Sequence, residues 1–322
     1  MNQRFFGALG VVAALVAVPA GCNSGSTARN SGSNVVFGVN MPLFDGNEQM
    51  VTNAGTRAMF AGWHTPVIRM PFRSTLSDAV ELQGLRAIAS VGAAPLVVVH
   101  GAVDANVVTD DVHLLGLVAQ VFGSSPVYVE YGNEEDLTGV DAPAYTRSWN
   151  ATVPILRWLH PTYRFEGPVN FEYDPAYVGY FVGHALPLPD VVSWHEYVCT
   201  PSQPTSYCMS HIANWSTHVL YTNFAEVVAI GRSLPFMFTE WNMDPQEDPR
   251  YLDPTVMGPW MAAAVQELER LIPDGLVGAQ LYAADSHGGG FELVDPSNAL
   301  TPEGQAFAGA IGQVASAPPP AF

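Results

Sequence analysis

From residue 35 onward, short runs of hydrophobic residues alternate with longer amphipathic segments. Short and nearly continuous apolar runs are typical of strands that are buried in a parallel sheet. Eight such runs can be counted, at residues 35–39, 67–70, 96–99, 127–130, 163–165, 191–194, 236–239 and 276–282. We therefore predict eight parallel β-strands.

Between these runs, hydrophobic residues recur at the spacing of an α-helix. The pattern is clearest at 212–228, and Gly231 is a typical helix stop. It is formed there by Ile212, Trp215, Val219, Leu220, Phe224, Val227 and Val228. The other predicted helices lie near 51–63, 76–91, 110–122, 145–159, 176–184, 255–271 and 304–314.

The strict alternation of eight strands with eight helices predicts a single closed (β/α)8 barrel, the TIM barrel, over residues 34–314. A doubly wound open sheet is the alternative, but no glycine-rich phosphate loop opens any of the helices. In a barrel of this class, functional residues lie where the strands end and the strand-to-helix loops begin. We therefore look for candidate catalytic and binding residues at those strand ends.

Charge narrows the range of partners. The chain of 322 residues has a formal net charge of −18, and all twelve of its basic residues are arginine. An acidic surface without basic runs repels phosphate backbones, which excludes nucleic acid as an expected partner. Neutral or weakly charged ligands fit better, and we expect a monomer.

The N-terminus has the pattern of an export signal. Arg4 precedes an apolar run at 5–18, which is too short to span a bilayer but has the length of a signal-peptide core. The signal peptide can be processed in two ways: by ordinary cleavage after Ala20, or as a lipoprotein in which Cys22 is lipidated. Pro19 stands where the lipoprotein motif usually has Leu. The polar linker that follows favours the lipoprotein, because a tether needs such a segment.

This interpretation divides the chain into a lipoprotein signal peptide at 1–21, a polar linker at 22–33, the barrel, and a flexible Ala/Pro-rich tail at 315–322. The protein is then exported, either as a cell-envelope lipoprotein or in secreted form. It meets a membrane only through the lipid.

Two further cysteines, Cys199 and Cys208, flank a Pro/Ser/Thr-rich segment that is expected to be a loop. In an exported chain such a pair predicts a disulfide. A zinc site is disfavoured, because neither a further cysteine nor a close histidine completes a set of ligands; His211 alone is more often solvated.

Carboxylates follow two of the predicted strands. After the fourth strand the chain reads YGNEED at 131–136, and after the seventh it reads TEWN at 239–242. Cleavage of a glycosidic bond needs two carboxyl groups, one to protonate the leaving oxygen and one to attack or to activate water. Glu134 or the adjacent Glu135 on one side and Glu240 on the other are the candidates.

These segments resemble clan A of the glycoside hydrolases. VEYGNE at 129–134 is similar to the EIGNE segment of that clan, and FTEWN at 238–242 is similar to the TEWN of glycoside hydrolase family 39. The resemblance implies Glu134 as general acid/base, Glu240 as nucleophile and Asn133 as a contact to the sugar 2-hydroxyl, without a metal or cofactor. Because the acid follows Asn directly in the family pattern, Glu135 becomes a structural or solvated carboxylate.

Other strand ends extend the expected substrate site. The period of a strand places His195 and Tyr197 on one face, and the pair resembles the His-x-Tyr that clan members place beside the nucleophile. Arg69 is similar in position to an arginine that holds the nucleophile. His100 and Tyr282 are expected to line the sugar subsite, and Trp241 or Trp194 to supply a stacking platform, unless these rings belong to the rim or the core.

Taken together, the resemblance implies a retaining hydrolase that acts on β-linked or equivalent glycosidic bonds of a polysaccharide or oligosaccharide. The β-sandwich that many exo-acting members of family 39 carry is missing from this chain, so endo and exo action both stay open. Two rivals remain: a non-catalytic carbohydrate-binding lipoprotein and a polysaccharide lyase.

Overall fold

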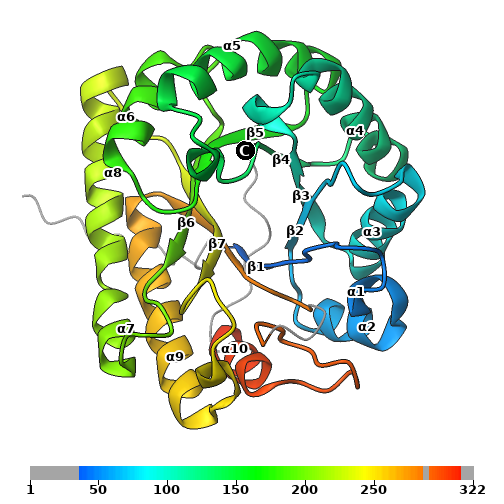
Figure 1. Ribbon diagram of the computed structural model, residues 1–322, viewed down its shortest axis with the longest axis vertical. Helices are drawn as coiled ribbons and strands as arrows, with labels where there is room; N and C mark the ends of the chain where they lie inside the picture. The colour runs from blue at the N-terminus through cyan, green and yellow to red at the C-terminus, as the bar shows by residue number, and fades with distance from the viewer. Residues whose placement is uncertain (1–35, 286–289, 313–322) are drawn as a thin grey trace, which may run out of the picture. The chain divides into compact units, whose positions relative to one another are not determined.

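Eight parallel strands pair in sequence order, and the last pairs with the first to close a barrel (Figure 1). The computed structural model describes residues 36–285 and 290–312. The strands are β1 (Val36–Asn40), β2 (Val67–Pro71), β3 (Ala94–Val99), β4 (Tyr128–Tyr131), β5 (Arg164–Asn170), β6 (Val191–Tyr197), β7 (Phe236–Asn242) and β8 (Leu276–Leu281). The predicted single (β/α)8 barrel is confirmed, and the open doubly wound sheet is wrong.

Helices cover the outside of the barrel. They are α1 (Gln49–Thr52), α2 (Ala54–Gly62), α3 (Asp78–Val91), α4 (Val107–Phe122), α5 (Ala142–Leu159), α6 (Pro175–His184), α7 (Thr205–His211), α8 (Asn214–Ile230), α9 (Pro254–Leu271) and α10 (Pro302–Ile311). Short 3-10 turns are η1 (Gly101–Val103), η2 (Glu135–Thr138), η3 (Pro249–Leu252) and η4 (Ile272–Asp274). Two details differ from the prediction: Asn53 divides the first helix, and α7 occupies part of an expected loop.

Several helices begin at an acidic cap in the loop that follows a strand. The side chains of Asp141, Asp174 and Asp253 accept hydrogen bonds from backbone N–H groups in the first turns of α5, α6 and α9. A carboxylate at this place satisfies free donors and is attracted by the positive end of the helix dipole. At the other end, Gly231 takes the left-handed conformation that closes α8, as its position in the sequence predicted.

The interior of the barrel has an apolar layer with a polar layer above it. Val67, Leu96, Tyr128, Val191 and Met237 form a small cluster near the N-terminal ends of their strands. Further along the strands, several buried residues are polar: Arg69, Glu130, Glu166, Ser193 and Gln280. A separate large cluster fills the space between the strands and the helices. The polar layer lies directly beneath the strand ends, where the candidate catalytic and binding residues were predicted from the sequence.

A bulge in β7 decides which way its last residues point. Trp194 pairs with Phe238, but the next residue, His195, pairs with Glu240, so Thr239 is an extra residue in β7. An extra residue reverses the alternation of side chains along a strand. As a result Trp241 packs on the helix side, as Phe238 does, and Glu240 points into the mouth of the barrel.

The predicted signal peptide at 1–21, Cys22, the linker at 22–33 and the tail at 315–322 lie outside the described residues. Within the described ranges, none of the helices combines the length and the apolar character needed to cross a membrane.

Candidate active site

A cavity of about 800 Å³ opens at the C-terminal ends of the strands. Seven of the residues predicted from the sequence line it: Arg69, His100, Asn133, Glu134, Tyr197, Glu240 and Tyr282. They come from the ends of β2, β3, β4, β6, β7 and β8 or from the positions that follow them. This is the place at which barrels of this class carry their active sites, and the volume is that of a ligand site.

Glu240 is held from both sides by strong donors. Arg69 donates a hydrogen bond from Nη1 to one carboxylate oxygen, and the hydroxyl of Tyr197 donates to the other at 2.7 Å. Burial alone would raise the pKa of Glu240, but the charges of His195 and Arg69 and the two hydrogen bonds lower it below its ordinary value. The carboxylate is therefore ionised and fixed in direction.

Glu134 has a looser environment. Its side chain is 22% exposed, and its Oε1 lies 2.8 Å from Nδ1 of His195. The backbone of Glu134 is left-handed, with φ of 50°, and its N–H donates to the carbonyl of Val169, which is also left-handed at φ of 60°. Non-glycine residues reach this conformation only at a cost, and such strain gathers at functional sites.

His195 stands between the two carboxylates. Its Nδ1 is 2.8 Å from Glu134 and 3.7 Å from Glu240, and the imidazole is completely buried. Burial lowers the pKa of His195, but the charge of Glu240 and the hydrogen bond and charge of Glu134 raise it above the ordinary value. From the sequence, His195 was expected beside the proposed nucleophile, Glu240. In the structure, the hydrogen bond of His195 is to Glu134, and the side chain of this pair that donates to Glu240 is Tyr197.

Arg69 connects the cavity to the polar layer below it. Besides Glu240, it donates from Nε to Glu130, from Nη1 to Asn40 at 2.9 Å and from Nη2 to Asn133 at 2.6 Å. Such charge-assisted bonds fix the planar guanidinium group. Asn40 was not among the residues predicted for the site. It is a polar residue at the end of an apolar strand, and Arg69 was predicted from the same kind of position.

Glu135, the rival acid, points away from the cavity. Its carboxylate lies against Gly101 and Gly132 and accepts a hydrogen bond from the N–H of Val103 at 3.2 Å. Both glycines have positive φ, and a Cβ on either would meet the carboxylate at 2.5 Å or less. Burial raises the pKa of Glu135 to about 7. It supports the loop that carries Glu134.

The aromatic platform differs from the prediction. Trp241 is fully buried among Trp215, Trp260 and Phe307, and Trp194 is fully buried against Phe236 and Phe238. The prediction that Trp241 contacts the substrate is therefore wrong, because the bulge at Thr239 turns the ring of Trp241 to the helix side. Rings that do line the cavity include Tyr282 and Tyr197, which were predicted, and Phe72, Phe171 and Phe291, which were not.

Two groups of side chains in the described part of the chain have donor atoms within 4.8 Å of one another, the spacing needed to hold a metal ion: His100, Asp104 and Asp110, and Glu134, His195 and Glu240. In the second group, Arg69 and Tyr197 already engage both oxygens of Glu240. A cation there would compete with a fixed guanidinium charge. That group is better suited to proton transfer and nucleophilic attack.

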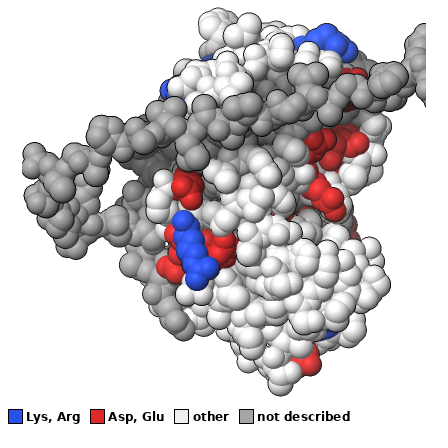
Figure 2. Space-filling view, turned by 90° about the vertical axis from the view of Figure 1, so that its left-hand side faces the viewer, with Lys and Arg blue, Asp and Glu red and all other residues white. Residues whose placement is uncertain are grey.

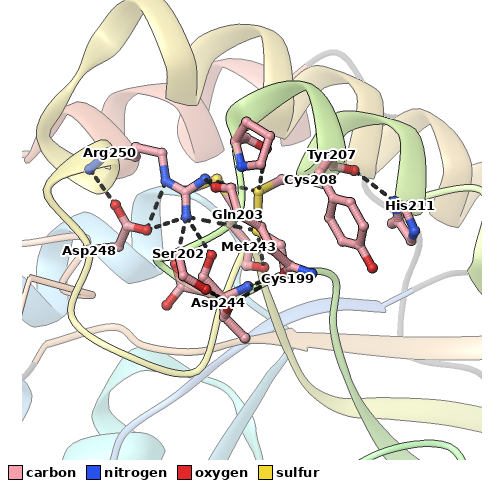
Figure 3. The surroundings of a disulfide bond; sticks show 12 residues. Cys199, Ser202, Gln203, Tyr207, Cys208, His211, Met243, Asp244, Asp248 and Arg250 are labelled. Atoms are coloured by element: carbon pink, nitrogen blue, oxygen red, sulfur yellow. Dashed lines mark hydrogen bonds and ion pairs between the residues drawn. A yellow bond between two sulfur atoms is a disulfide. The ribbon is translucent and has the colours of Figure 1, made fainter.

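A disulfide between Cys199 and Cys208 follows β6 directly and confirms the predicted pair. Cys208 belongs to α7 and not to a loop. Figure 3 shows Arg250 between this disulfide and Asp248. Arg250 donates to the carbonyls of Thr200 and Gln203 at 3.1 and 2.9 Å, so the segment after Tyr197 is closed by a covalent bond and an arginine.

The fold is that of the clan A glycoside hydrolase barrels, in agreement with the resemblance of the sequence. A family 39 β-xylosidase from Caulobacter crescentus superposes with a TM-score of 0.61 at 17% identity, over 87% of this chain and 72% of that one. A 4-O-α-L-rhamnosyl-β-D-glucuronidase from Fusarium oxysporum reaches 0.66 at 13% identity, over 87% and 69%.

A third solved structure, an oligosaccharide-binding protein of glycoside hydrolase family 128 from Trichoderma gamsii, reaches 0.54 at 16% identity, over 88% of this chain and 96% of that one. No protein-family model matches the sequence, and no curated protein matches it significantly. At these identities the comparison defines the fold, and the chemistry has to be argued from the site.

Proposed function

We propose that the protein is a retaining glycoside hydrolase that cleaves β-linked or equivalent bonds of an oligosaccharide or polysaccharide. One observation carries the proposal: one carboxylate oxygen of Glu134 and one of Glu240 lie within 4.8 Å of each other in a ligand-sized cavity, and the two side chains have unlike surroundings. Retaining enzymes hold their carboxyl groups about 5–5.5 Å apart, whereas inverting enzymes need about 6.5–9.5 Å to admit a water molecule.

In the proposed mechanism, ionised Glu240 attacks the anomeric carbon while Glu134 protonates the leaving oxygen, and a glycosyl-enzyme ester forms. Having given its proton to the leaving oxygen, Glu134 is a carboxylate. Because esterification has removed the negative charge of Glu240, Glu134 keeps this form until it takes a proton from the water that attacks the ester and releases the sugar. Asn133, held by Arg69, is the group we expect at the sugar 2-hydroxyl.

Azide rescue tests the two roles separately. With an aryl β-glycoside, Glu134→Ala should still form the ester but hydrolyse it slowly, and azide should restore turnover with the β-glycosyl azide as product. Glu240→Ala cannot form the ester, so azide entering the vacated face should give the α-azide. If Glu135→Ala shows the acid/base behaviour and Glu134→Ala stays active, the assignment of Glu134 is wrong.

One observation favours a second candidate, a carbohydrate-binding protein without turnover: the family 128 structure with this fold is described as oligosaccharide-binding. A panel of aryl β-glycosides and polysaccharides, assayed for both hydrolysis and binding, separates the two functions. Binding without any hydrolysis supports the second candidate.

For location, the proposal is an exported lipoprotein anchored at Cys22. Mass spectrometry of the mature N-terminus tests it, and Cys22→Ser should release the protein from membranes or block its processing. A wild-type protein found entirely in the soluble exported fraction contradicts the anchor.

A further inference from the structure

The exposed residues of α8 are uncharged, and large apolar side chains are prominent among them. Leu220 and Phe224 are 66% and 67% exposed, Val228 is 71% exposed, and the only acidic residue of this helix, Glu226, is buried. The face of the molecule in Figure 2, the side on which α8 lies in Figure 1, is mostly uncharged in its described residues. Large exposed apolar patches on soluble domains mark interaction sites.

The patch continues onto the neighbouring helices. A Cβ on Gly179 or Gly183 of α6 would lie 3.5 Å from Ala225 or Ala229 of α8, so the two helices pack closely and their outer faces join. Leu186 follows α6, and its N–H donates to Asn150 of α5. We define the apolar edge as six exposed residues, Trp158 of α5, Tyr180 of α6, Leu186, and Leu220, Phe224 and Val228 of α8.

Half of the apolar edge, Trp158, Leu186 and Val228, lies at the end of the barrel that is opposite the cavity. Helices in this fold run antiparallel to the strands, so the C-terminal ends of the helices lie at the N-terminal ends of the strands. Trp158 is in the last turn of α5, Leu186 follows the end of α6, and Val228 is in the last turn of α8. Val36, which begins β1 and receives the chain from the N-terminal segment, is at the same end.

Charge is divided between the two ends in this part of the barrel. The acidic residues Asp141, Glu172 and Asp174 lie in the loops at the cavity end, and α5 and α6 contain no acidic residue. Near the apolar edge, Arg157 is at the end of α5, Arg164 begins β5 and Arg232 follows α8. Of the acids at this end, Asp190 pairs with Arg157 at 2.8 Å, and the backbone carbonyl of Asp274 accepts a hydrogen bond from Asn223 of α8.

We propose that the apolar edge docks on the lipid surface to which the chain is tethered, with the mouth of the barrel turned away from it. The inference rests on the proposed anchor at Cys22. From Cys22 to Val36 the chain can span at most about 50 Å, so the barrel stays close to the bilayer. Aromatic and aliphatic side chains beside arginines are the composition that binds an anionic lipid interface, while the acidic cavity end is repelled from it.

Trp158, at 79% exposure, is a natural probe of this contact. The full-length protein is mixed with vesicles of phosphatidylcholine and phosphatidylglycerol that contain brominated phosphatidylcholine, which quenches tryptophan only at close range. Wild-type fluorescence should fall, and Trp158→Phe should lose that quenching. The double variant Leu220→Asp, Phe224→Asp should lose it too, with vesicle partitioning at least about tenfold weaker.

Leu252→Asp is the matched control, because Leu252 is 56% exposed in η3 before α9, at the cavity end. It should be quenched like the wild type. Absence of quenching in the wild type, or equal quenching in the double variant, overturns the proposal. A wild-type dimer in sedimentation velocity that the double variant converts to monomer also overturns it and makes the edge a protein interface.

Hydrolysis of an aryl β-glycoside is measured on the same samples. Loss of hydrolysis in every sample, with the quenching pattern intact, contradicts the proposed function and leaves docking in place. Hydrolysis without quenching contradicts docking alone.

Discussion

Glu240 at the end of β7 and Glu134 after β4 face the same cavity, but their hydrogen bonds and their exposure to solvent differ. Both oxygens of Glu240 accept hydrogen bonds from buried donors, Arg69 and Tyr197, that are themselves fixed. Glu134 has the histidine contact and is twice as exposed, at 22% of its side chain against 11%. A nucleophile has to stay ionised and aligned, whereas an acid/base has to gain and lose a proton within reach of water. The contrast teaches that local restraint, more than residue type, separates the two proposed roles.

The largest expected effect comes from removing the restrained carboxylate. Glu240→Ala should lower kcat on an aryl β-glycoside by a factor on the order of 10⁶, as loss of a catalytic nucleophile does elsewhere. Steady-state assays, with intact-mass spectrometry for a trapped glycosyl-enzyme, measure it. Residual activity within a hundredfold of wild type would contradict the assignment.

Glu134→Ala should cost less, and the cost should depend on the leaving group. For an alkyl or sugar leaving group, which needs a proton, we expect a loss of about 10²–10⁴ in kcat/KM. For a dinitrophenyl group, bond cleavage should be nearly normal and the ester should accumulate. A loss that is the same for both substrates would mean that Glu134 only shapes the site.

Tyr197→Phe tests the restraint itself and should reduce kcat/KM by roughly tenfold to a hundredfold, the effect of one hydrogen bond to a charged group. Because Glu240 acts as the anion, activity is lost as pH falls through its pKa. The hydroxyl lowers that pKa, so its removal should move the acidic limb of the pH profile to higher pH.

Tyr282→Phe is the control for that shift, since it deletes a hydroxyl from the same cavity while the Tyr197 bond to Glu240 remains. Its acidic limb should stay near that of the wild type. An unmoved limb in Tyr197→Phe would show that this bond does not tune Glu240.

The smallest effect on catalysis should come from the disulfide. Replacing Cys199 and Cys208 by Ala should lower the free energy of unfolding by at most about 2–3 kcal/mol, since the loop is short. The backbone N–H groups of Val198 and Cys199 still donate to the carbonyl of Met243 and hold β6 to the segment after β7. Chemical denaturation and kcat/KM of the double variant check this; a loss beyond tenfold in kcat/KM would give the bridge a role in the site.

The sequence allowed the barrel, and the meeting of Glu134 and Glu240 in one cavity, to be predicted, because both depend on regular signals. Apolar runs mark the strands, and in a barrel every strand end leads to one face, which brings distant positions such as 134 and 240 together. Trp241 was misplaced because a single extra residue, Thr239, reverses the alternation, and no local property of the sequence marks a bulge.

Buried polar groups were also beyond prediction. Glu130 lies in the fourth predicted strand, and only the three-dimensional structure shows it paired with Arg69 inside the barrel. Hydrophobic pattern likewise detected α8 but not its orientation. Leu220, Phe224, Val227 and Val228 contribute to its helical period, yet all four face solvent.

The polar layer inside the barrel also bears on the energy of the proposed reaction. Both oxygens of Glu166 have no hydrogen-bond partner among the described residues, and burial together with the charge of Glu130 raises its pKa well above the ordinary value. Both effects favour the protonated form of Glu166. In the resting state, the guanidinium group of Arg69 pairs with two carboxylates, Glu130 and Glu240. In the proposed reaction a sugar esterifies Glu240 and neutralises one of these partners, so the covalent intermediate leaves Arg69 paired with the Glu130 carboxylate beneath it.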